Sequence, residues 1–319
     1  MTYQAAGDET PNGGISVIIC AYTEDRWDDI VRAIQSIKQQ TYSAREIILV
    51  IDHNRPLFEH ARSTIEASAI VENTSARGLS GARNCGLAVA RGDFIAFLDD
   101  DAVAAPDWLE RLHAHCAQPG VLGAGGWVEP HWVDSQPAWF PDEFLWVVGC
   151  SYVGLPRSTA SVRNPFGGCS CLRREVFEQV GGFRTEIGRV GARPLGCEET
   201  ELSIRARQHW PGRTFVHEPR ATIRHKVPAV RGTARYFTWR CYSEGLSKAW
   251  LARRLGARDG LASERRYVTR VLPSGVMRGV LDGLLHHDTG GFGRAGAIIL
   301  GLGFTSFGYL VGRLNQSLS

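Results

Sequence analysis

The chain has 319 residues, of which 44% are hydrophobic and 22% are charged. This length suits one α/β domain with an appended region, and the composition excludes a disordered or collagen-like protein. The formal net charge of +3 hides an asymmetry, because residues 1–219 carry 20 Lys and Arg against 28 Asp and Glu, whereas residues 220–319 carry 16 against 5. We therefore expect an acidic catalytic half and a basic half that meets phospholipid or substrate phosphate, and no nucleic-acid partner.

Apolar strands and amphipathic helices alternate in the N-terminal part of the chain. Unbroken apolar runs predict strands that are buried on both faces, and apolar residues at spacings of three and four predict helices. This alternation indicates a mostly parallel α/β sheet of the nucleotide-binding kind, in which ligands bind beyond the carboxyl ends of the strands. In chain order, the predicted segments are the strand 15–22, the helix 27–37, the strands 46–52 and 69–73, the helix 78–92 and the strand 93–101.

The pattern is looser in the middle of the chain. Gly167 and Gly168 either let the backbone approach a ligand closely or form a tight loop. The last helix in this region opens with acidic residues, which suits the positive end of a helix dipole. The predicted segments are a helix from Pro106, a strand over 121–128, a Pro- and Trp-rich loop to about Pro165, and helices over 173–180 and 198–210.

Carboxylates stand at the ends of three predicted strands. Glu24 follows the first strand, Asp52 ends the second, and Asp99, Asp100 and Asp101 end the strand near residue 95. Adjacent aspartates shift one another's protonation unless a cation neutralises them, so we expect a divalent metal there. Oxygen ligands in a partly open shell suit Mg²⁺ or Mn²⁺ bound together with substrate phosphates.

The eight cysteines include no C-x-x-C pair, and several stand in apolar runs. This usage favours reduced thiols in a cytosol over a disulfide framework or a zinc site. The first 14 residues contain no apolar stretch of the kind found in secretory signals. We therefore expect a cytoplasmic location.

The C-terminal region has two features that bear on membranes. Residues 246–258 predict a basic amphipathic helix. Residues 295–312 are uncharged, and Arg294 and Arg313 bound them. Such a run is marginal for crossing a bilayer, because about 20 residues are needed. Attachment to a membrane surface, a true span, and a buried hairpin or homodimer interface all remain open, with peripheral attachment to the inner face of the cell membrane favoured.

Seven segments in a fixed order carry a resemblance to a known family. They are SVIICAYTED, EIILVIDHN, GARNCG, FIAFLDDDAVAAPDWL, NPFGGCSCLRREVFEQVGGF, GCEETELSIR and IRHK. From about Ile15 to about Val227 the chain resembles the inverting family-2 glycosyltransferases of the GT-A fold. The resemblance implies a GT-A domain that binds a nucleotide sugar over 15–230. We expect a flexible N-terminus over 1–14 and a helical C-terminal region over 231–319 on either side of it.

The resemblance also implies roles for single residues. The segment after the first strand and the aspartate after the second would hold the nucleobase and ribose, and a carboxylate suits a pyrimidine N3–H, which favours a UDP-sugar. In the family's D-x-D pair, the first aspartate would lie nearer the ribose and the last on the metal. The residues implied in nucleotide binding are Ala21, Thr23, Glu24, Asp52, Arg83, Asp99, Asp100 and Arg240, and those implied as metal ligands are Asp101 and His225.

Inverting transfer needs one general base that takes the proton from the acceptor hydroxyl. The residue at the position of the family's base is Glu199, where the family usually has Asp. The longer side chain moves the carboxylate by about one methylene but keeps its chemistry.

The sequence thus predicts an inverting, metal-assisted glycosyltransferase that moves a sugar from a nucleoside diphosphate to an acceptor hydroxyl in one displacement. A nucleotidyltransferase is an alternative, but it would carry a basic, glycine-rich loop where this chain has CAYTED. A nucleotide-binding scaffold without transferase activity is a second alternative, because Glu replaces Asp at the base. The acceptor is not identified by the sequence, although the basic tail favours a lipid-linked one.

Overall fold

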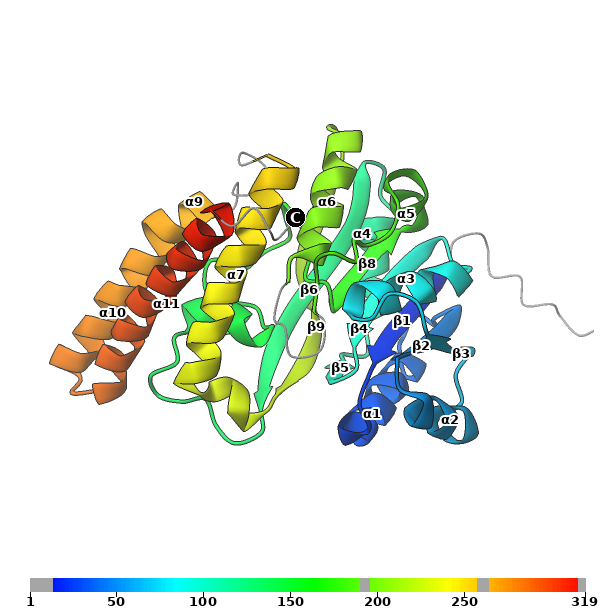
Figure 1. Ribbon diagram of the computed structural model, residues 1–319, viewed down its shortest axis with the longest axis horizontal. Helices are drawn as coiled ribbons and strands as arrows, with labels where there is room; N and C mark the ends of the chain where they lie inside the picture. The colour runs from blue at the N-terminus through cyan, green and yellow to red at the C-terminus, as the bar shows by residue number, and fades with distance from the viewer. Residues whose placement is uncertain (1–13, 190–195, 257–263, 315–319) are drawn as a thin grey trace, which may run out of the picture.

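The computed structural model describes residues 14–189, 196–256 and 264–314 (Figure 1). Within these ranges, the centre of the molecule is a nine-stranded sheet with the order β3-β2-β1-β4-β8-β6-β9-β5, and β7 pairs with β9. The N-terminal strands pair in parallel, which confirms the expected α/β class. The strands are β1 Ile15–Ala21, β2 Glu46–Asp52, β3 Ala69–Asn73, β4 Phe94–Asp99, β5 Ala102–Ala104, β6 Val121–Trp132, β7 Ala160–Val162, β8 Cys169–Arg173 and β9 Thr214–Val227.

Helices cover both faces of this sheet. Because side chains alternate along a strand, Val17 and Ile19 of β1 face one core while Ile18 faces the other. The first core contains the apolar faces of α1 (Trp27–Lys38), α2 (Arg55–Thr64) and α4 (Trp108–Cys116). The second contains those of α3 (Leu79–Val89), α5 (Arg174–Val180) and α6 (Glu198–His209). The sheet is therefore buried on both sides, as its continuous apolar runs predict.

Several elements were not predicted from the sequence, among them α2, β8 and β9. The helix α2 begins after Asn54, whose side chain accepts a hydrogen bond from the Leu57 N–H and caps the helix. The strand β8 joins β4 to β6 through antiparallel pairing on both sides. The strand β9 pairs in parallel with β6 and in antiparallel with β5 and β7. The expected loop to Pro165 also contains the helical turn η2 (Asp142–Val148) and β7.

The C-terminal region is helical. After the short turn η3 (Ala229–Gly232) come α7 (Ala234–Arg254), α9 (Glu264–Arg266), the π-helical turn η4 (Tyr267–Val271), α10 (Leu272–Leu285) and α11 (Thr289–Leu314). Figure 1 shows α7 lying between the sheet and an outer antiparallel pair formed by α10 and α11. The expected uncharged run 295–312 lies within α11. Of the expected flexible segment 1–14, all but Gly14 lies outside the described residues.

The helices α7 and α11 pack with their backbones in contact. A Cβ atom on Gly245 would lie 2.1 Å from the carbonyl oxygen of Thr305, and one on Gly308 would lie 2.1 Å from that of Tyr242. Only glycine fits at such a crossing. The hairpin of α10 and α11 is thereby held close against α7.

The expected basic amphipathic helix over 246–258 was only partly right. The described residues up to Arg254 belong to the longer helix α7, while Arg258 lies outside the described residues. Lys248 does not lie on a basic surface, because its ammonium group forms ion pairs with Glu244 and Glu264. Packing on two sides, against the sheet half and against α11, leaves α7 without the free face that membrane binding requires.

Candidate active site

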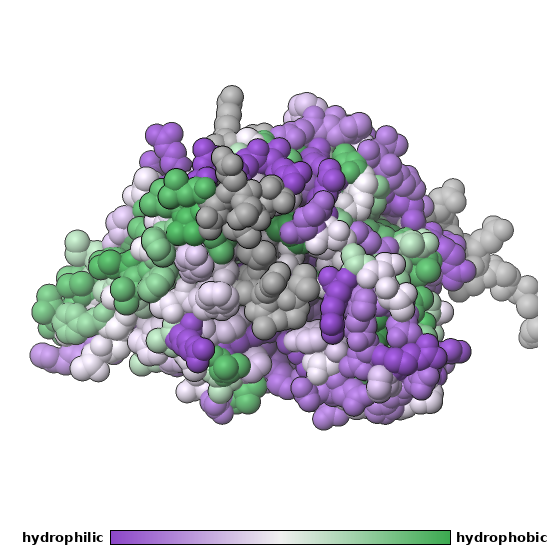
Figure 2. Space-filling model, viewed as in Figure 1, coloured by the Kyte–Doolittle hydropathy of each residue, from purple (hydrophilic) through white to green (hydrophobic). Residues whose placement is uncertain are grey.

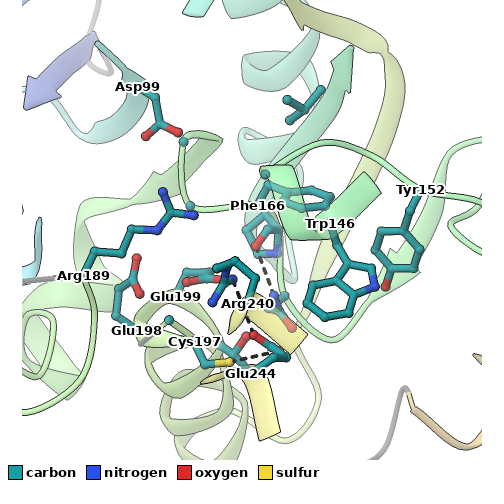
Figure 3. Close-up of a pocket in the computed structure, with 18 of the residues that line it drawn as sticks. Asp99, Trp146, Tyr152, Phe166, Arg189, Cys197, Glu198, Glu199, Arg240 and Glu244 are labelled. Atoms are coloured by element: carbon teal, nitrogen blue, oxygen red, sulfur yellow. Dashed lines mark hydrogen bonds and ion pairs between the residues drawn. The ribbon is translucent and has the colours of Figure 1, made fainter. Parts of the chain in front are cut away.

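A cavity of about 1080 Å³ opens beyond the carboxyl ends of β1, β2 and β4 and extends to α11. Its two ends differ in character (Figure 3). Asp99 and Arg189 lie at one end of the view, and Trp146 and Tyr152 lie on the opposite side. We call these the polar end and the apolar arm of the cavity.

Strand pairing brings His225 to the acidic triplet. Asp99 ends β4, and after the turn β5 pairs with β9 so that Ala102 stands opposite His225. The backbone N–H of Lys226 donates to the carbonyl oxygen of Asp101 at 2.9 Å. As a result, the His225 Nε2 lies 3.2 Å from the Asp101 Oδ1. Two residues far apart in the sequence thus meet through the register of one short strand.

Asp99, Asp101 and His225 could hold a metal ion together. Each offers one ligand atom, and these atoms lie within 4.8 Å of one another. Two carboxylates and an imidazole suit a divalent ion such as Mn²⁺. The donor set of the chain therefore fits the metal that the sequence predicts.

Asp100, the middle residue of the acidic triplet, forms an ion pair with Arg26. The Arg26 Nη1 lies 2.7 Å from the Asp100 Oδ1 and 3.1 Å from the Asp101 Oδ2. The Asp100 Oδ2 is buried without a hydrogen-bond partner among the described residues. Burial, together with the charge of Asp101, raises the pKa of Asp100 to about 7 against the opposing effect of Arg26. Burial also acts to raise the pKa of Asp101, but His225 and Arg26 outweigh it and hold that pKa below its ordinary value.

Arg83 links the acidic triplet to α6. Its buried guanidinium lies 2.9 Å from the Glu198 Oε1 and 3.8 Å from the Asp99 Oδ1. The glycine pair 167–168 packs directly on this group, since a Cβ on Gly167 would lie 2.9 Å from the Arg83 Nη1 and one on Gly168 would lie 2.2 Å from the Asp99 carboxylate. The glycines therefore let the loop before β8 close over Asp99 and Arg83.

Glu199 lies in the first turn of α6 and lines the same cavity. Cys197 precedes the helix with a φ of 75°, a left-handed conformation that is uncommon outside glycine. Burial, and next the neighbouring charge of Glu198, raises the pKa of Glu199 to about 8. A carboxylate with a raised pKa binds a proton more readily than an exposed one, which suits a general base.

Asp52 lines the cavity together with Ala21. Its carboxylate accepts hydrogen bonds from the Asn73 Nδ2 at 2.7 Å and from the Gly78 N–H at 2.9 Å. These contacts fix the orientation of the carboxylate and leave lone pairs for a further donor.

Two of the expected nucleotide-binding residues do not line the cavity. Thr23 and Glu24 are absent from its lining, and Glu24 is exposed. The Thr23 hydroxyl accepts a hydrogen bond from the Asp25 N–H at 3.3 Å and caps the helical turn η1 (Glu24–Arg26). This turn places Arg26, rather than Glu24, against the acidic triplet.

Charged residues of α7 line the middle of the cavity. Arg240 is buried, and its Nη2 lies 3.7 Å from the Glu244 Oε2. Glu244 in turn lies 3.3 Å from the Lys248 Nζ, which also pairs with Glu264. Burial would lower the pKa of Lys248, but the two glutamates outweigh it and hold the pKa above its ordinary value. The structure thus brings Arg240 to the cavity, as expected, within a network that the sequence did not predict.

Sequence reasoning missed several arginines that line the cavity. Among them are Arg26, Arg189 and Arg231. The Arg231 Nη1 lies 3.5 Å from the His225 Nε2 and its Nη2 lies 3.8 Å from the Asp101 Oδ2. Arg26 could have been noticed from its place directly after the first strand and beside two acids, whereas nothing in the sequence around Arg189 marks it.

The apolar arm has aromatic walls. The Tyr267 hydroxyl donates to the backbone carbonyl of Glu143 at 2.6 Å and accepts from the Trp146 Nε1 at 3.0 Å. The ring of Tyr152 meets those of Tyr267 and Phe166 edge-on, with centroids 5.4 and 6.5 Å away. The arm is therefore a fixed surface that could contact a sugar ring or a hydrocarbon chain.

Known proteins resemble this chain in sequence. Residues 16–181 match the family described as "Glycosyl transferase family 2". A glucosyl-dolichyl phosphate glucuronosyltransferase of Haloferax volcanii is 32% identical over 238 residues, which are 73% of this chain and 76% of that protein. The succinoglycan biosynthesis protein ExoM of Rhizobium meliloti is 25% identical over 300 residues, which are 84% of this chain and 93% of that protein.

Solved structures share the fold. A mannosyltransferase of Pyrobaculum calidifontis in complex with GDP-Man and Mn²⁺ superposes with a TM-score of 0.59 at 18% identity, covering 98% of this chain and 90% of that one. GalNAc-T7 with UDP, GalNAc and Mn²⁺ gives a TM-score of 0.52 at 15% identity, covering 88% of this chain and 59% of that one. These likenesses establish the GT-A fold. With the family match and the sequence relatives, they lead to the conclusion that the chain belongs to glycosyl transferase family 2 and is a glycosyltransferase that uses a nucleotide-sugar donor.

Proposed function

We propose that this enzyme transfers a sugar from a nucleoside diphosphate to an acceptor hydroxyl with inversion, in one displacement assisted by a divalent metal ion. The observation that carries the proposal is that a single cavity holds both the acidic triplet and Glu199. One buried guanidinium, that of Arg83, contacts both Asp99 and the Glu198 beside Glu199. Groups for holding a diphosphate and for accepting a proton are thus fixed relative to each other.

Asp99, Asp101 and His225 would hold the metal ion, Mg²⁺ or Mn²⁺. The imidazole in the donor set favours Mn²⁺, since Mg²⁺ prefers oxygen ligands alone. When bound, the ion would stabilise the charge that develops on the leaving nucleoside diphosphate. Both structural neighbours are complexes with Mn²⁺, which supports this assignment.

Asp52 and Ala21 would face the nucleobase and ribose, and Asp100, Arg83 and Arg240 would lie toward the rest of the nucleotide. The anchored Asp52 carboxylate can accept from a uracil N3–H, which favours a UDP-sugar. The solved structures similar to this chain differ in their nucleotides, because one contains GDP-Man and the other UDP. Thr23 and Glu24, which lie off the lining, would at most border the bound base.

Glu199 would act as the general base. The acceptor oxygen attacks the anomeric carbon as its proton passes to the Glu199 carboxylate and as the bond from the sugar to the diphosphate oxygen breaks. Attack from the face opposite the diphosphate inverts the anomeric centre. Burial beside Glu198, which raises the pKa of Glu199 to about 8, supports this role.

A lipid-linked acceptor is part of the proposal, with the protein bound peripherally to the cytoplasmic face of a membrane. The Haloferax relative is named for a dolichyl phosphate, and a relative from Escherichia coli, 38% identical over 89 residues, is named for a diphosphoundecaprenol. The helix α11 is long and apolar enough to cross a membrane, by length and composition alone.

Thermal shift and product analysis test the proposal. We expect a nucleoside diphosphate to raise the melting temperature in the presence of Mn²⁺ more than in its absence, with UDP or UDP-sugars giving the largest rise. NMR of the transferred sugar should show the anomeric configuration opposite to that of the donor. A product with the donor's configuration, or no stabilisation by any nucleotide, would overturn it.

A further inference from the structure

The hairpin of α10 and α11 packs with small residues inside and large apolar residues outside. A Cβ on Gly279 would lie 2.6 Å from the carbonyl oxygen of Gly291, so the two backbones touch. Helices in water normally bury their large apolar side chains, whereas small residues at the helix contact are typical of membranes. The apolar side chains exposed by more than a third on this outer face are Met277, Leu281, Leu284, Leu285, Phe292, Ile299, Leu300, Phe304, Phe307, Leu310 and Leu314.

Figure 2 shows apolar surface over this hairpin, at the edge of the molecule far from β1–β3. The sheet half has few such side chains on its surface. A patch of this extent on a soluble protein marks a contact with a membrane or another protein.

Charge beside the hairpin favours a membrane surface over a span. Arg265 and Arg266 of α9, Arg270 of η4 and Arg313 of α11 are exposed. Each acidic residue between positions 264 and 314 forms an ion pair, namely Glu264, Asp282 and Asp288. Arginines beside an apolar face suit anionic lipid headgroups. At 1.5 Å per residue, α10 is about 21 Å long and too short to cross the hydrocarbon core, so the hairpin as a unit cannot span it, although α11 alone is long enough.

The apolar arm of the cavity reaches this outer face. Val268 and Leu310 line the cavity and are also 37% and 59% exposed. Arg266 lines the cavity beside them and has no ion-pair partner among the described residues. The mouth thus combines one cation with apolar side chains, at the edge of the surface that would face lipid.

We propose that the outer face of α10 and α11 rests in an anionic membrane surface and that the mouth at Arg266 receives a lipid phosphate. The phosphate binds Arg266, and the hydrocarbon chain passes over Val268 and Leu310 into the membrane. A sugar carried on this phosphate extends along the apolar arm toward the polar end. This inference rests on the proposed function, because it identifies the entry of that reaction's acceptor.

Vesicle flotation tests the membrane face. We compare the full chain with a double variant, Leu300→Ser with Phe307→Ser, using vesicles of phosphatidylcholine alone and of phosphatidylcholine with phosphatidylglycerol. The full chain should float with the anionic vesicles, and the double variant should lose at least tenfold in partitioning. The control Val133→Ser, at a side chain 52% exposed outside the hairpin, should float like the full chain.

Nucleotide binding and oligomeric state are measured on the same samples. The double variant should keep the thermal shift given by UDP with Mn²⁺, which shows that it is folded. Flotation equal to that of the full chain overturns the inference. So does a change from dimer to monomer in the variant without any flotation of the full chain, because a second copy would then cover the face.

Farnesyl phosphate, below its micelle concentration, probes the mouth by equilibrium binding. It should bind at least tenfold more tightly than farnesol or inorganic phosphate, because both the chain and the phosphate are recognised. Arg266→Gln should weaken its binding about tenfold, whereas Arg270→Gln, an exposed arginine outside the cavity lining, should not. Equal binding of the three probes, or no effect of Arg266→Gln, overturns the inference.

Hydrolysis of the nucleotide sugar by water separates the two proposals. It requires the polar end but no lipid. If hydrolysis and nucleotide binding persist while farnesyl phosphate fails to bind, only this inference fails. If no nucleotide binds, the proposed function fails, whatever the lipid experiments give.

Discussion

The two ends of the cavity are built in opposite ways. The polar end gathers carboxylates and guanidinium groups at strand ends and the start of α6, where the acidic triplet and Glu198 form ion pairs at 2.7–3.8 Å. The apolar arm is walled by aromatic rings from η2 to η4 and by residues of α11. The family match over residues 16–181 includes the acidic triplet of the polar end and the rings of Trp146, Tyr152 and Phe166 of the apolar arm. Glu199, His225 and the helices α7, α10 and α11 lie outside it.

This difference separates the chemistry from the choice of acceptor. The charged groups of the polar end would bind the diphosphate and take up the proton whichever acceptor is used. Changes there should therefore impair every reaction of the enzyme. Aromatic and aliphatic walls bind by shape and burial, so changes there should alter only the acceptor that is used. Measuring transfer and donor hydrolysis side by side distinguishes the two.

Asp101→Asn should have the largest effect. It removes one charge of the proposed metal site and leaves His225 and Arg26 without their shared partner. We expect both transfer and donor hydrolysis to fall about 10³-fold, or ~4 kcal/mol of transition-state stabilisation. Asp107→Asn, which changes a partly exposed aspartate paired with Arg111, serves as the control. Normal turnover with Mn²⁺ in Asp101→Asn would contradict the metal assignment.

Glu199→Gln should nearly match that loss in transfer, while nucleotide binding survives. The amide has nearly the shape of the carboxylate but cannot accept a proton, so we expect kcat to fall 10²–10³-fold, within the range of general acid–base groups. Thermal shift by UDP with Mn²⁺ should be unchanged. Glu178→Gln, at an exposed position on α5, provides the matched control, and full turnover in Glu199→Gln would remove Glu199 as the base.

Gly168→Ala should impair the polar end without changing any of its charged groups. The added methyl would lie 2.2 Å from the Asp99 carboxylate, which must then move. Because misplacement by about 1 Å can cost 10²-fold, we expect that loss in kcat/KM for both transfer and hydrolysis. Gly212→Ala has open space around its Cβ and should behave like the natural enzyme. An active Gly168→Ala would show that the position of Asp99 is not critical.

The polar end could be predicted from the sequence only where its residues follow buried strands. Asp52 and Asp99 end β2 and β4, and those strands were evident because each is an unbroken apolar run. The parallel order of such strands brings their carboxyl ends to one edge of the sheet. The resemblance to the family then added Arg83 and Glu199, and the structure places both on the cavity lining.

The contacts between distant segments could not be predicted in the same way. His225 meets Asp101 only because β5 and β9 pair in one register, and no local pattern specifies that register. A signal for β9 was nonetheless present, since Ala221, Ile223, His225 and Val227 alternate as its buried residues. The polar His225 at one of the buried positions obscured this alternation.

The C-terminal helices show a second limit of sequence reasoning. The basic residues after Gly245 indicated a membrane-binding face on α7, but Gly245 and Gly308 let α11 cover that helix. Glycine at a helix crossing cannot be told from glycine in a loose helix by sequence alone. The apolar surface therefore lies on the hairpin next to the segment where it was expected.

The pH profile tests the polar end without a mutation. Burial beside Glu198 raises the pKa of Glu199 to about 8, and the base must be unprotonated to act. The value of kcat/KM should therefore rise with pH, about tenfold per unit below pH 8, and level off above it. In Glu199→Gln this rise of kcat/KM below pH 8 should disappear together with most of the activity. If the residual activity of the variant rose with pH in the same way, the titrating group would be another residue.

Tyr267→Phe should have the smallest effect and should act only on the acceptor. It removes the hydroxyl that bridges the Glu143 carbonyl and the Trp146 indole, which costs about 1 kcal/mol and loosens one wall of the apolar arm. We expect KM for the acceptor to rise about fivefold, while the rate of donor hydrolysis and the thermal shift by UDP stay unchanged. Tyr242→Phe, on α7 and outside the cavity lining, should change none of these. If Tyr267→Phe slowed hydrolysis and transfer equally, the apolar arm would belong to the chemistry, and the division of the cavity into two ends would be wrong.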